Sequence, residues 1–304
     1  MRFSPEVKEA LAQGRPVVAL ETSVIAQGLP PPTNLEAASA CDRSVREGGA
    51  VPAAIGLIDG EIWIGLSFSQ VRYLAEHPHR TKVGFRDLAP VSAKRGTGGT
   101  TVSATCEVAA SAGIRVFATG GIGGVHRASA EHWDVSQDLW TISRCPVAVV
   151  SAGAKSVLDV PKTLEALEAL GVPVIGVGTD EFPSFYSRDS GLRLEHRVDD
   201  AELAAQVMRA RFDDGRQGGI LFALPLPESA ALPRAEVEAH VEAAVLLAAR
   251  KGIRGKELTP FLLGEIARRT DGRSLSANLA LLAQNARFAA ELAAADARLR
   301  SLRS

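Results

Sequence analysis

The chain has little cysteine, and its three cysteines form no recognisable pattern. Cys41, Cys106 and Cys145 are odd in number, far apart and without a C-x-x-C spacing. This arrangement gives no indication of a disulfide framework or of a zinc site. Each cysteine lies in an apolar or mixed segment, so we expect all three to be small core residues.

The sequence also lacks a strong charge of one sign and any long apolar run. Its formal net charge is −1 over 304 residues, with an isoelectric point near 6.6. That balance lacks the electrostatic signature of a protein that binds nucleic acid or an anionic membrane. No apolar run approaches about 18 residues, and there is no secretory signal pattern. We therefore expect a cytoplasmic protein whose partner is a small molecule, and a small anionic substrate remains possible in a local basic pocket.

No internal repeat, low-complexity linker or long charge run interrupts the chain, which predicts a single domain over residues 1–304. The amino-terminal half alternates short apolar strands with Gly-rich turns and amphipathic helices, whereas helices predominate beyond about residue 200. We expect an α/β fold with three layers, α/β/α, a mostly parallel or mixed central sheet and a helix-rich carboxyl-terminal part.

The expected elements follow from apolar periodicity, helix start signals and turn residues. Strands are expected at 17–20, 53–58, 61–64, 115–119, 147–155, 172–177 and 218–224. Helices are expected at 33–46, 67–75, 102–112, 156–170, 201–211, 236–251, 259–269 and 274–302. Asp59-Gly60 predicts a hairpin between two of the strands, and residues 147–177 predict a βαβ unit with parallel strands.

Lysine is scarce as well, since only seven of the 34 Lys and Arg residues are lysines. Lys155 nevertheless ends the apolar run 147–155, near the carboxyl end of a buried strand, where open α/β sheets place their ligands. An amine can be desolvated, deprotonated and used as a nucleophile toward a carbonyl, which a guanidinium cannot. The alternative is a structural lysine that reaches the surface from the strand end.

Two more segments carry polar residues that a plain strand or turn would not need. Glu21 directly follows the strand at 17–20, where burial would make it a general acid and exposure would leave it an ordinary surface carboxylate. Segment 96–103 is rich in Gly and Thr and precedes a helix. It is either a phosphate cradle, with Lys82 as a nearby positive charge, or a structural turn.

Segments 119–127 and 131–139 follow the strand at 115–119. The first has four glycines in five positions, which indicates close approach of the backbone to a ligand or to another loop. His126 at its end suits an anion or proton transfer. In the second, Asp134 and Asp138 are four residues apart and would share one face of a helix. They suit Mg²⁺ or Mn²⁺, unless they form an acidic helix start.

Together these segments resemble the pseudouridine-5′-phosphate glycosidase family, also labelled indigoidine synthase A-like, from about residue 4 to 290. The most specific stretches are 17–21, 117–127 and 151–155, and 255–263 and 274–278 agree as well. The resemblance implies reversible cleavage of the C–C glycosidic bond of pseudouridine 5′-phosphate, giving uracil and ribose 5-phosphate, in nucleotide catabolism. A carbon leaving group requires an electron sink at C1′, and a lysine imine on the ring-opened sugar provides one.

The resemblance also implies roles for individual residues. Lys155 is the implied nucleophile, Glu21 the proton donor that assists ring opening, and Asp134 the residue that holds one Mn²⁺ per subunit, largely through water. The implied substrate-binding residues are Lys82, Thr101, Val102, Thr119, His126, Ser136, Gln137, Asp138 and Asn278, the last of them at the base. The implied protein is a homotrimeric pseudouridylate synthase, a carbon–oxygen lyase.

The sequence differs from the family pattern at three places, namely Thr22-Ser23, Gln27 and Gln137, which bear on substrate preference rather than on reaction type. Two other functions are consistent with the residues. One is a lysine-imine aldolase or lyase that acts on another sugar phosphate. The other is a sugar-phosphate-binding module that uses the glycine loops without catalysis.

Overall fold

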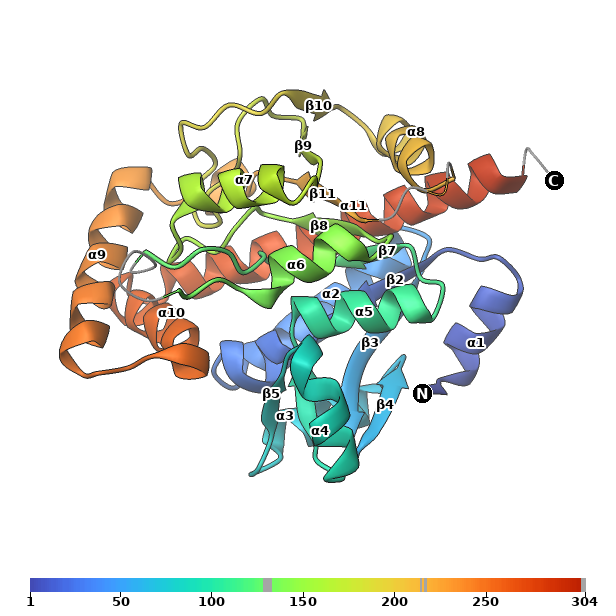
Figure 1. Cartoon of the computed structure of the whole chain (residues 1–304), viewed down its shortest axis with the longest axis horizontal. Helices are drawn as coiled ribbons and strands as arrows, with labels where there is room; N and C mark the ends of the chain where they lie inside the picture. Colours follow the sequence, from blue (N-terminus) through green and yellow to red (C-terminus); the bar gives the residue numbers. More distant parts are fainter. Residues whose placement is uncertain (128–132, 214, 216–217, 302–304) are drawn as a thin grey trace.

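The computed structural model describes residues 1–127, 133–213, 215 and 218–301, and Figure 1 shows the arrangement of their elements. Glu131 and His132, which belong to the acidic segment considered above, lie outside the described residues. So does residue 302, at the end of the last expected helix. The described chain forms an α/β fold with a mixed, mostly parallel sheet and long carboxyl-terminal helices, as expected.

The sheet places the amino-terminal and central strands side by side. Its path runs β1 (Arg2–Phe3), β4 (Glu61–Ile64), β3 (Val51–Ile58), β2 (Val17–Leu20), β7 (Val116–Ala118), β8 (Ala148–Ser151), β11 (Ile220–Ala223), β9 (Val174–Val177) and β10 (His196–Val198). Two further strands, β5 (Thr81–Val83) and β6 (Gly98–Thr100), join it through β3. Among the described strands only β3–β4 and β3–β6 pair in antiparallel fashion.

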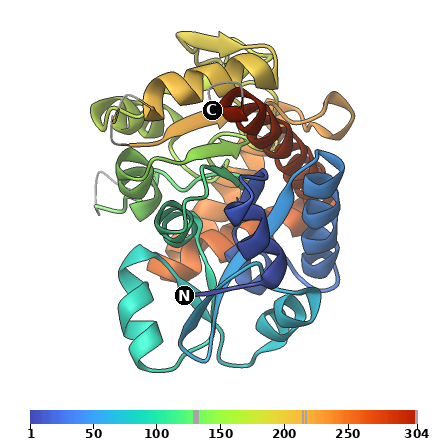
Figure 2. The same ribbon diagram turned by 90° about the vertical axis from the view of Figure 1, so that its right-hand side faces the viewer.

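Helices cover both faces of this sheet. The α-helices of the described chain are α1 (Pro5–Ala12), α2 (Thr33–Glu47), α3 (Phe68–Glu76), α4 (Leu88–Ala93), α5 (Val102–Ser111), α6 (Gln137–Arg144), α7 (Val160–Ala169), α8 (Ala201–Phe212), α9 (Arg234–Arg250), α10 (Leu258–Arg269) and α11 (Arg273–Ser301), of which α9 and α10 pack on each other beside the sheet. In Figures 1 and 2, α5 and α6 lie on one face, while α2 and α11 lie on the other. The central strands are therefore buried on both sides, which explains their continuous apolar sequences.

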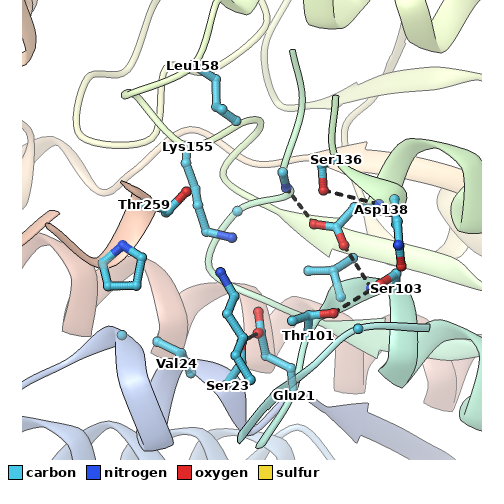
Figure 3. A pocket seen from close by; sticks show the side chains of 18 of the residues that line it. Glu21, Ser23, Val24, Thr101, Ser103, Ser136, Asp138, Lys155, Leu158 and Thr259 are labelled. Atoms are coloured by element: carbon cyan, nitrogen blue, oxygen red, sulfur yellow. Dashed lines mark hydrogen bonds between the residues drawn. The ribbon is translucent and has the colours of Figure 1, made fainter. Parts of the chain in front are cut away.

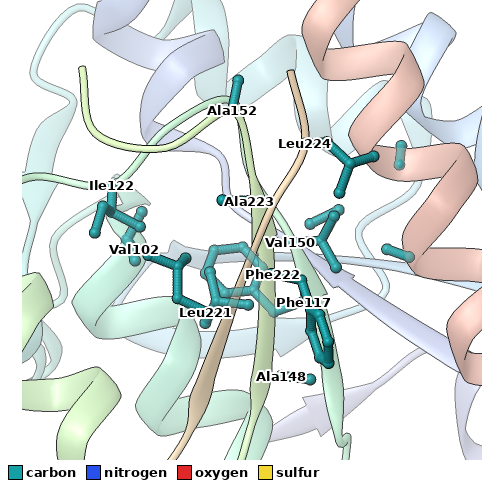
Figure 4. Close-up of a cluster of buried hydrophobic side chains, with 14 of the residues drawn as sticks. Val102, Phe117, Ile122, Ala148, Val150, Ala152, Leu221, Phe222, Ala223 and Leu224 are labelled. Carbon is teal, nitrogen blue, oxygen red and sulfur yellow. The ribbon is translucent and has the colours of Figure 1, made fainter. Parts of the chain in front are cut away.

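The core between the layers consists of aromatic and branched side chains. Phe117 on β7, Val150 on β8 and Phe222 on β11 have no exposed surface and gather in one cluster (Figure 4). The three cysteines are also buried and unpaired, as expected for small core residues. Burial raises the pKa of the Cys41 thiol to about 12, so this group stays protonated and inert near neutral pH.

Most of the expected elements are confirmed within a few residues, including the hairpin. Asp59 and Gly60 have φ values of 50° and 83°, the left-handed geometry that a two-residue hairpin turn requires. Strands β8 and β9 both pair in parallel with β11, which lies between them. The two strands of the predicted βαβ unit are therefore parallel but not adjacent. No helix in the described part of the chain combines the length and apolarity needed to cross a membrane.

Two local expectations are wrong. Residues 156–159 form a turn rather than the start of a helix, because the Asp159 side chain caps α7 by accepting a hydrogen bond from the Lys162 amide at 3.1 Å. Residues 98–100 form the strand β6 rather than a Gly-rich turn. A Cβ added at Gly99 would lie 2.7 Å from the Thr22 carbonyl oxygen. The glycine therefore permits close packing of protein backbone.

Candidate active site

A polar cavity of about 340 Å³ opens where three neighbouring strands end. The strands β2, β7 and β8 are adjacent and parallel, so their carboxyl ends meet at one edge of the sheet. Glu21 follows β2, the glycine loop follows β7, and Lys155 lies four residues beyond β8. Figure 3 shows Glu21 and Lys155 on opposite sides of the same pocket.

The structure brings nearly all the predicted site residues to this cavity. Its lining includes Glu21, Lys82, Thr101, Val102, His126, Asp134, Ser136, Gln137, Asp138, Lys155 and Asn278. Thr119 does not line it but lies directly behind, where its hydroxyl donates a hydrogen bond to Glu21 Oε1. Residues separated by more than 250 positions along the chain thus meet at one site.

The carboxyl group of Glu21 is buried, with 7% of the residue exposed. Thr119 Oγ1 hydrogen-bonds one carboxyl oxygen, and Ser23 Oγ donates to the other at 2.5 Å. These two hydroxyls fix the orientation of the carboxyl group, and each can also accept a hydrogen bond if Glu21 is protonated. The buried alternative considered for Glu21 from the sequence is therefore the one observed. The contribution of Ser23 is a feature that sequence reasoning missed.

The backbone that carries Lys155 is hydrogen-bonded to the glycine loop. The Lys155 amide donates to the Ile122 carbonyl at 3.1 Å, and the Ile122 amide donates to the Gly153 carbonyl at 3.0 Å. Strand β8 ends earlier than expected, at Ser151, because Gly153 adopts φ 78° and turns the chain. Lys155 is half-buried and extends into the cavity (Figure 3) rather than out to bulk solvent.

Replacing Gly153 with Ala is expected to destabilise the fold strongly. A Cβ there would lie 2.2 Å from the Pro183 carbonyl oxygen, in addition to the cost of the left-handed φ. We expect a loss of about 2–4 kcal/mol in the free energy of unfolding, measured by guanidinium denaturation. Gly171→Ala is the matched control, because Gly171 has φ 67° and nothing within 4 Å of its Cβ position. Equal losses in the two variants would contradict the steric explanation.

The loop after β7 borders the cavity through Gly120, Gly121 and Gly123, and it also packs tightly against protein. A Cβ at Gly123 would lie 2.3 Å from Ser136 Oγ, and one at Gly124 would lie 2.3 Å from Thr163 Oγ1. The Gly123 amide donates to Asp138 Oδ2 at 2.8 Å. The close approach predicted from this loop is therefore both to the cavity and to protein, namely the start of α6 and Thr163 of α7.

Asp134 and Asp138 do not share a helix face, contrary to the expectation from their spacing. Helix α6 begins at Gln137 with Ser136 as its cap, so Asp134 lies in the preceding extended segment. Asp138 is buried and its carboxylate accepts hydrogen bonds from the Ser103 and Gly123 amides at 2.9 and 2.8 Å. Through these bonds Asp138 of α6 holds α5 and the glycine loop together in the wall of the cavity.

Asp134, for which the resemblance implies a metal ion, lines the cavity. Its backbone carbonyl accepts a hydrogen bond from the His126 amide at 3.0 Å, which holds it at the cavity. The described residues contain no group of three or more His, Cys, Asp or Glu side chains that could surround a metal. One carboxylate with water is a donor set that hard divalent ions accept, so the site fits an ion bound mainly through water.

His126 faces the charged groups of the cavity. Burial lowers the pKa of its imidazole, Asp134 raises it, and Lys82 and Lys155 lower it further. His126 is consequently neutral at neutral pH, so it can accept a proton or donate a hydrogen bond without adding charge. Because the unfolded chain binds this proton more tightly, His126 favours folding above its ordinary pKa and opposes it as the pH falls below that value.

Titration of His126 by NMR in the metal-free protein is expected to give a midpoint below the ordinary value of 6.5. Replacing Asp134 with Asn should lower the midpoint further, because it removes a carboxylate that favours the charged imidazole. Replacing Lys82 with Met should raise it. A midpoint above 6.5, or shifts of the opposite sign, would contradict the assigned interactions.

The remaining wall residues come from the ends of short elements. Thr101 is the residue before α5, and its amide donates to the Val83 carbonyl at 2.9 Å. Lys82 lies on β5 in the same wall. Gln137 Oε1 accepts a hydrogen bond from the Arg86 amide at 3.3 Å. This part of the cavity therefore combines a lysine, hydroxyl groups and a helix start, which together suit a phosphate group.

Helix α11 forms part of the cavity wall through Asn278. Asn278 lines the cavity with 3% of its surface exposed, and its Oδ1 is buried without a hydrogen-bond partner among the described residues. About two helical turns further along α11, the Nδ2 atom of Asn285 donates a hydrogen bond to the Thr119 carbonyl at 2.8 Å. The sequence reading did not identify Asn285, because an Asn inside a long helix carries no signal of a contact so distant along the chain.

A second cavity of about 710 Å³ borders Glu21 from the other side. It is lined mainly by apolar residues of α2, α3 and β3 and does not include Lys155, His126 or Asp134. The polar cavity is therefore the candidate active site, although it is the smaller of the two.

Comparison with known proteins agrees with the resemblance noted from the sequence. A family model described as indigoidine synthase A like protein matches residues 6–295. Proteins named pseudouridine-5′-phosphate glycosidase are similar throughout. That of Myxococcus xanthus is 62% identical over 98% of this chain and 99% of its own. That of Caldanaerobacter subterraneus is 52% identical over 96% and 95%.

Two solved structures are similar in fold. The prealnumycin C-glycosynthase AlnA, in complex with ribulose 5-phosphate, has a TM-score of 0.91 at 38% identity, covering 99% of this chain and 98% of its own. An indigoidine synthase A-like protein from Thermotoga maritima has a TM-score of 0.86 at 38% identity, covering 93% of each chain. The chain therefore belongs to the indigoidine synthase A-like family, that of the pseudouridine-5′-phosphate glycosidases.

Proposed function

We propose that the protein is an enzyme that reversibly cleaves the C–C glycosidic bond of pseudouridine 5′-phosphate to uracil and ribose 5-phosphate, through an imine on Lys155. The observation that carries this proposal is that Lys155 and the buried Glu21 line the same cavity. The names of the similar proteins support the substrate. The ribulose 5-phosphate in the AlnA structure supports sugar-phosphate chemistry.

In the proposed reaction, the Lys155 amine forms a bond to C1′ while the C1′–O4′ bond breaks. Glu21 gives its proton to O4′, which makes the ring oxygen a neutral leaving group. The nitrogen then loses a proton and C5 of the base gains one. As the C1′–C5 bond breaks, its electron pair restores the C5=C6 double bond of uracil, and the nitrogen lone pair forms the iminium.

Water then adds to the iminium carbon and releases ribose 5-phosphate as the aldehyde, which restores the amine of Lys155. The C4′ hydroxyl closes onto the aldehyde and its proton returns to Glu21, while the aldehyde oxygen takes up the proton set free when water hydrolysed the iminium. The net change is the addition of one water across the glycosidic bond, so atoms and electrons balance without an oxidant or a reductant. Covalent attachment divides a difficult C–C cleavage into easier steps.

The other wall residues bind and orient the substrate in this proposal. Lys82, Thr101 and the start of α5 bind the phosphate, and Asn278 faces the base. His126 is neutral and adjacent to both lysines, so it can move a proton near the reacting carbon. Asp134 would hold Mn²⁺, and the positive charge of the ion would offset the negative charge of the substrate phosphate.

The test is a uracil-release assay with pseudouridine 5′-phosphate, with and without Mn²⁺. Release of uracil that depends on the ion is the expected result. Absence of uracil release, together with sugar-phosphate binding that is unchanged by Glu21→Ala and Lys155→Ala, would favour a binding module instead. A trapped lysine adduct without uracil chemistry would favour an aldolase or lyase.

We also propose that residues 1–304 act as one catalytic domain in a cytoplasmic homotrimer. The support for one domain is that cavity residues come from both ends of the described chain, from Glu21 to Asn278. The support for the trimer and the location is the family membership alone. Sedimentation analysis of the full chain tests the trimer.

A further inference from the structure

Phe185 has an unusual backbone conformation for a buried aromatic residue. Its φ is 58°, in the left-handed region, and only 2% of its surface is exposed. The other three non-glycine residues with positive φ in the described chain are Asp59, Arg95 and Asp271. A bulky residue in this region is an outlier, and such backbone strain concentrates at functional sites.

Several contacts hold Phe185 in this conformation. Its amide donates to the Ala152 carbonyl at 3.1 Å, and Ser184 forms an antiparallel bridge with Gly153. Its ring packs edge-on against Tyr186, with 4.7 Å between the ring centroids. The surrounding fold therefore determines the backbone at 185 more strongly than the intrinsic preference of phenylalanine does.

The Phe185 ring also presses on the glycine loop. A Cβ added at Gly121 would lie 2.6 Å from Phe185 Cδ2, so the ring occupies the space that any side chain at 121 would need. Phe185 is thus in contact with two segments close to Lys155, namely the turn that precedes this lysine and the glycine loop to which the lysine amide is hydrogen-bonded. Its amide reaches the turn at 152, and its ring reaches the loop at 121.

These two segments are the ones that fix the Lys155 backbone. Ala152 donates to the Gly120 carbonyl at 2.9 Å, and Lys155 donates to the Ile122 carbonyl at 3.1 Å. Phe185 lines the same cavity as Lys155 and Glu21. A shift of the ring would let the two segments move relative to each other, and with them the amine.

We propose that Phe185 is a positioning residue for Lys155, which acts by clamping the turn at 152–153 against the glycine loop. This proposal rests on the proposed function, because it assigns Phe185 a part in imine formation. Nucleophiles displaced by about 1 Å from their productive geometry lose about 10²-fold in rate. Loss of the clamp should therefore slow the attack of the amine with little effect on sugar-phosphate binding.

The test compares Phe185→Leu and Phe185→Tyr with Phe222→Leu. Phe222 is fully buried in β11, so Phe222→Leu removes a similar aromatic contact from the core. The measurements are the thermal midpoint, the single-turnover rate of the borohydride-trapped ribose 5-phosphate adduct, and its dependence on sugar concentration. We expect a 10- to 100-fold slower adduct rate in Phe185→Leu at similar half-saturation. Phe185→Tyr should retain most of the rate, and Phe222→Leu should lose stability without losing rate.

A loss of stability in Phe185→Leu that matches Phe222→Leu, with an unchanged adduct rate, would overturn the positioning role. A second measurement does not depend on the sugar. After reductive methylation with ¹³C formaldehyde, the Lys155 signal should shift or broaden in Phe185→Leu and stay unchanged in Phe222→Leu. If the wild-type protein traps no adduct, the proposed function fails, while the ¹³C signal still decides whether Phe185 positions the lysine.

Discussion

Replacing Lys155 with Ala is expected to abolish uracil release, with a loss of at least about 10³-fold in kcat. The variant lacks the amine that forms the imine, so borohydride reduction with ribose 5-phosphate should leave no sugar on the protein. Lys155→Arg should be equally inactive, because a guanidinium keeps the positive charge but does not act as a nucleophile. Mass spectrometry of the reduced protein checks the adduct, and a coupled uracil assay checks the rate.

The matched control for this result is Lys162→Ala. Lys162 lies in α7, seven residues beyond Lys155, where its ammonium pairs with Asp159 at 2.9 Å on the surface. Exposed pairs of this kind contribute at most about 1 kcal/mol, so the control should keep its activity. An active Lys155→Ala variant would exclude the imine mechanism.

Replacing Glu21 with Gln is expected to lower kcat for pseudouridine 5′-phosphate by about 10²–10⁴-fold with little change in KM. Glutamine has the size of glutamate and can still hydrogen-bond Thr119 and Ser23, but it cannot donate the proton that assists ring opening. The steady-state assay with pseudouridine 5′-phosphate measures this loss.

The same variant separates the two halves of the mechanism. The open-chain form of ribose 5-phosphate already presents an aldehyde, so Glu21→Gln should still form the trapped adduct on Lys155. Glu36→Gln, an exposed position on α2, serves as the control and should behave like the wild type. Equal loss of adduct formation and of cleavage would contradict the assignment of Glu21 to ring opening.

The order and type of the elements could be predicted from the sequence because they depend on local patterns. Strands β2, β7 and β8 are continuous apolar segments, and α2 and α8 begin and end where periodicity and polar residues place them. The expectation of a helix start at 156–159 was wrong because of a local cap, whereas that of a turn at 98–100 was wrong because of long-range pairing. Residues 98–100 form a strand only because β3 and β5 lie beside them, and neither neighbour is local in sequence.

The candidate site could be predicted in part for a similar reason. Glu21 and Lys155 follow strands whose carboxyl ends meet, so their proximity follows from topology. The contact of Ser23 with Glu21 depends on how two neighbouring side chains are oriented, whereas Asn285 and Phe185 contact segments far away along the chain, and no spacing encodes either. The spacing of Asp134 and Asp138 was misleading, because the capping hydroxyl of Ser136 starts α6 between them.

Helix α11 brings a segment far along the chain to a site whose reactive residues belong to the first half and the middle of the sequence. Asn278 lines the cavity, and Asn285 donates a hydrogen bond to the Thr119 carbonyl behind it. A nascent chain still attached to the ribosome, with residues 273–301 inside the exit tunnel, already contains Glu21 and Lys155 but cannot complete the cavity around them. The pocket around the Lys155 amine can therefore form only after residues 273–301 have left the exit tunnel, whatever the order in which the earlier elements fold.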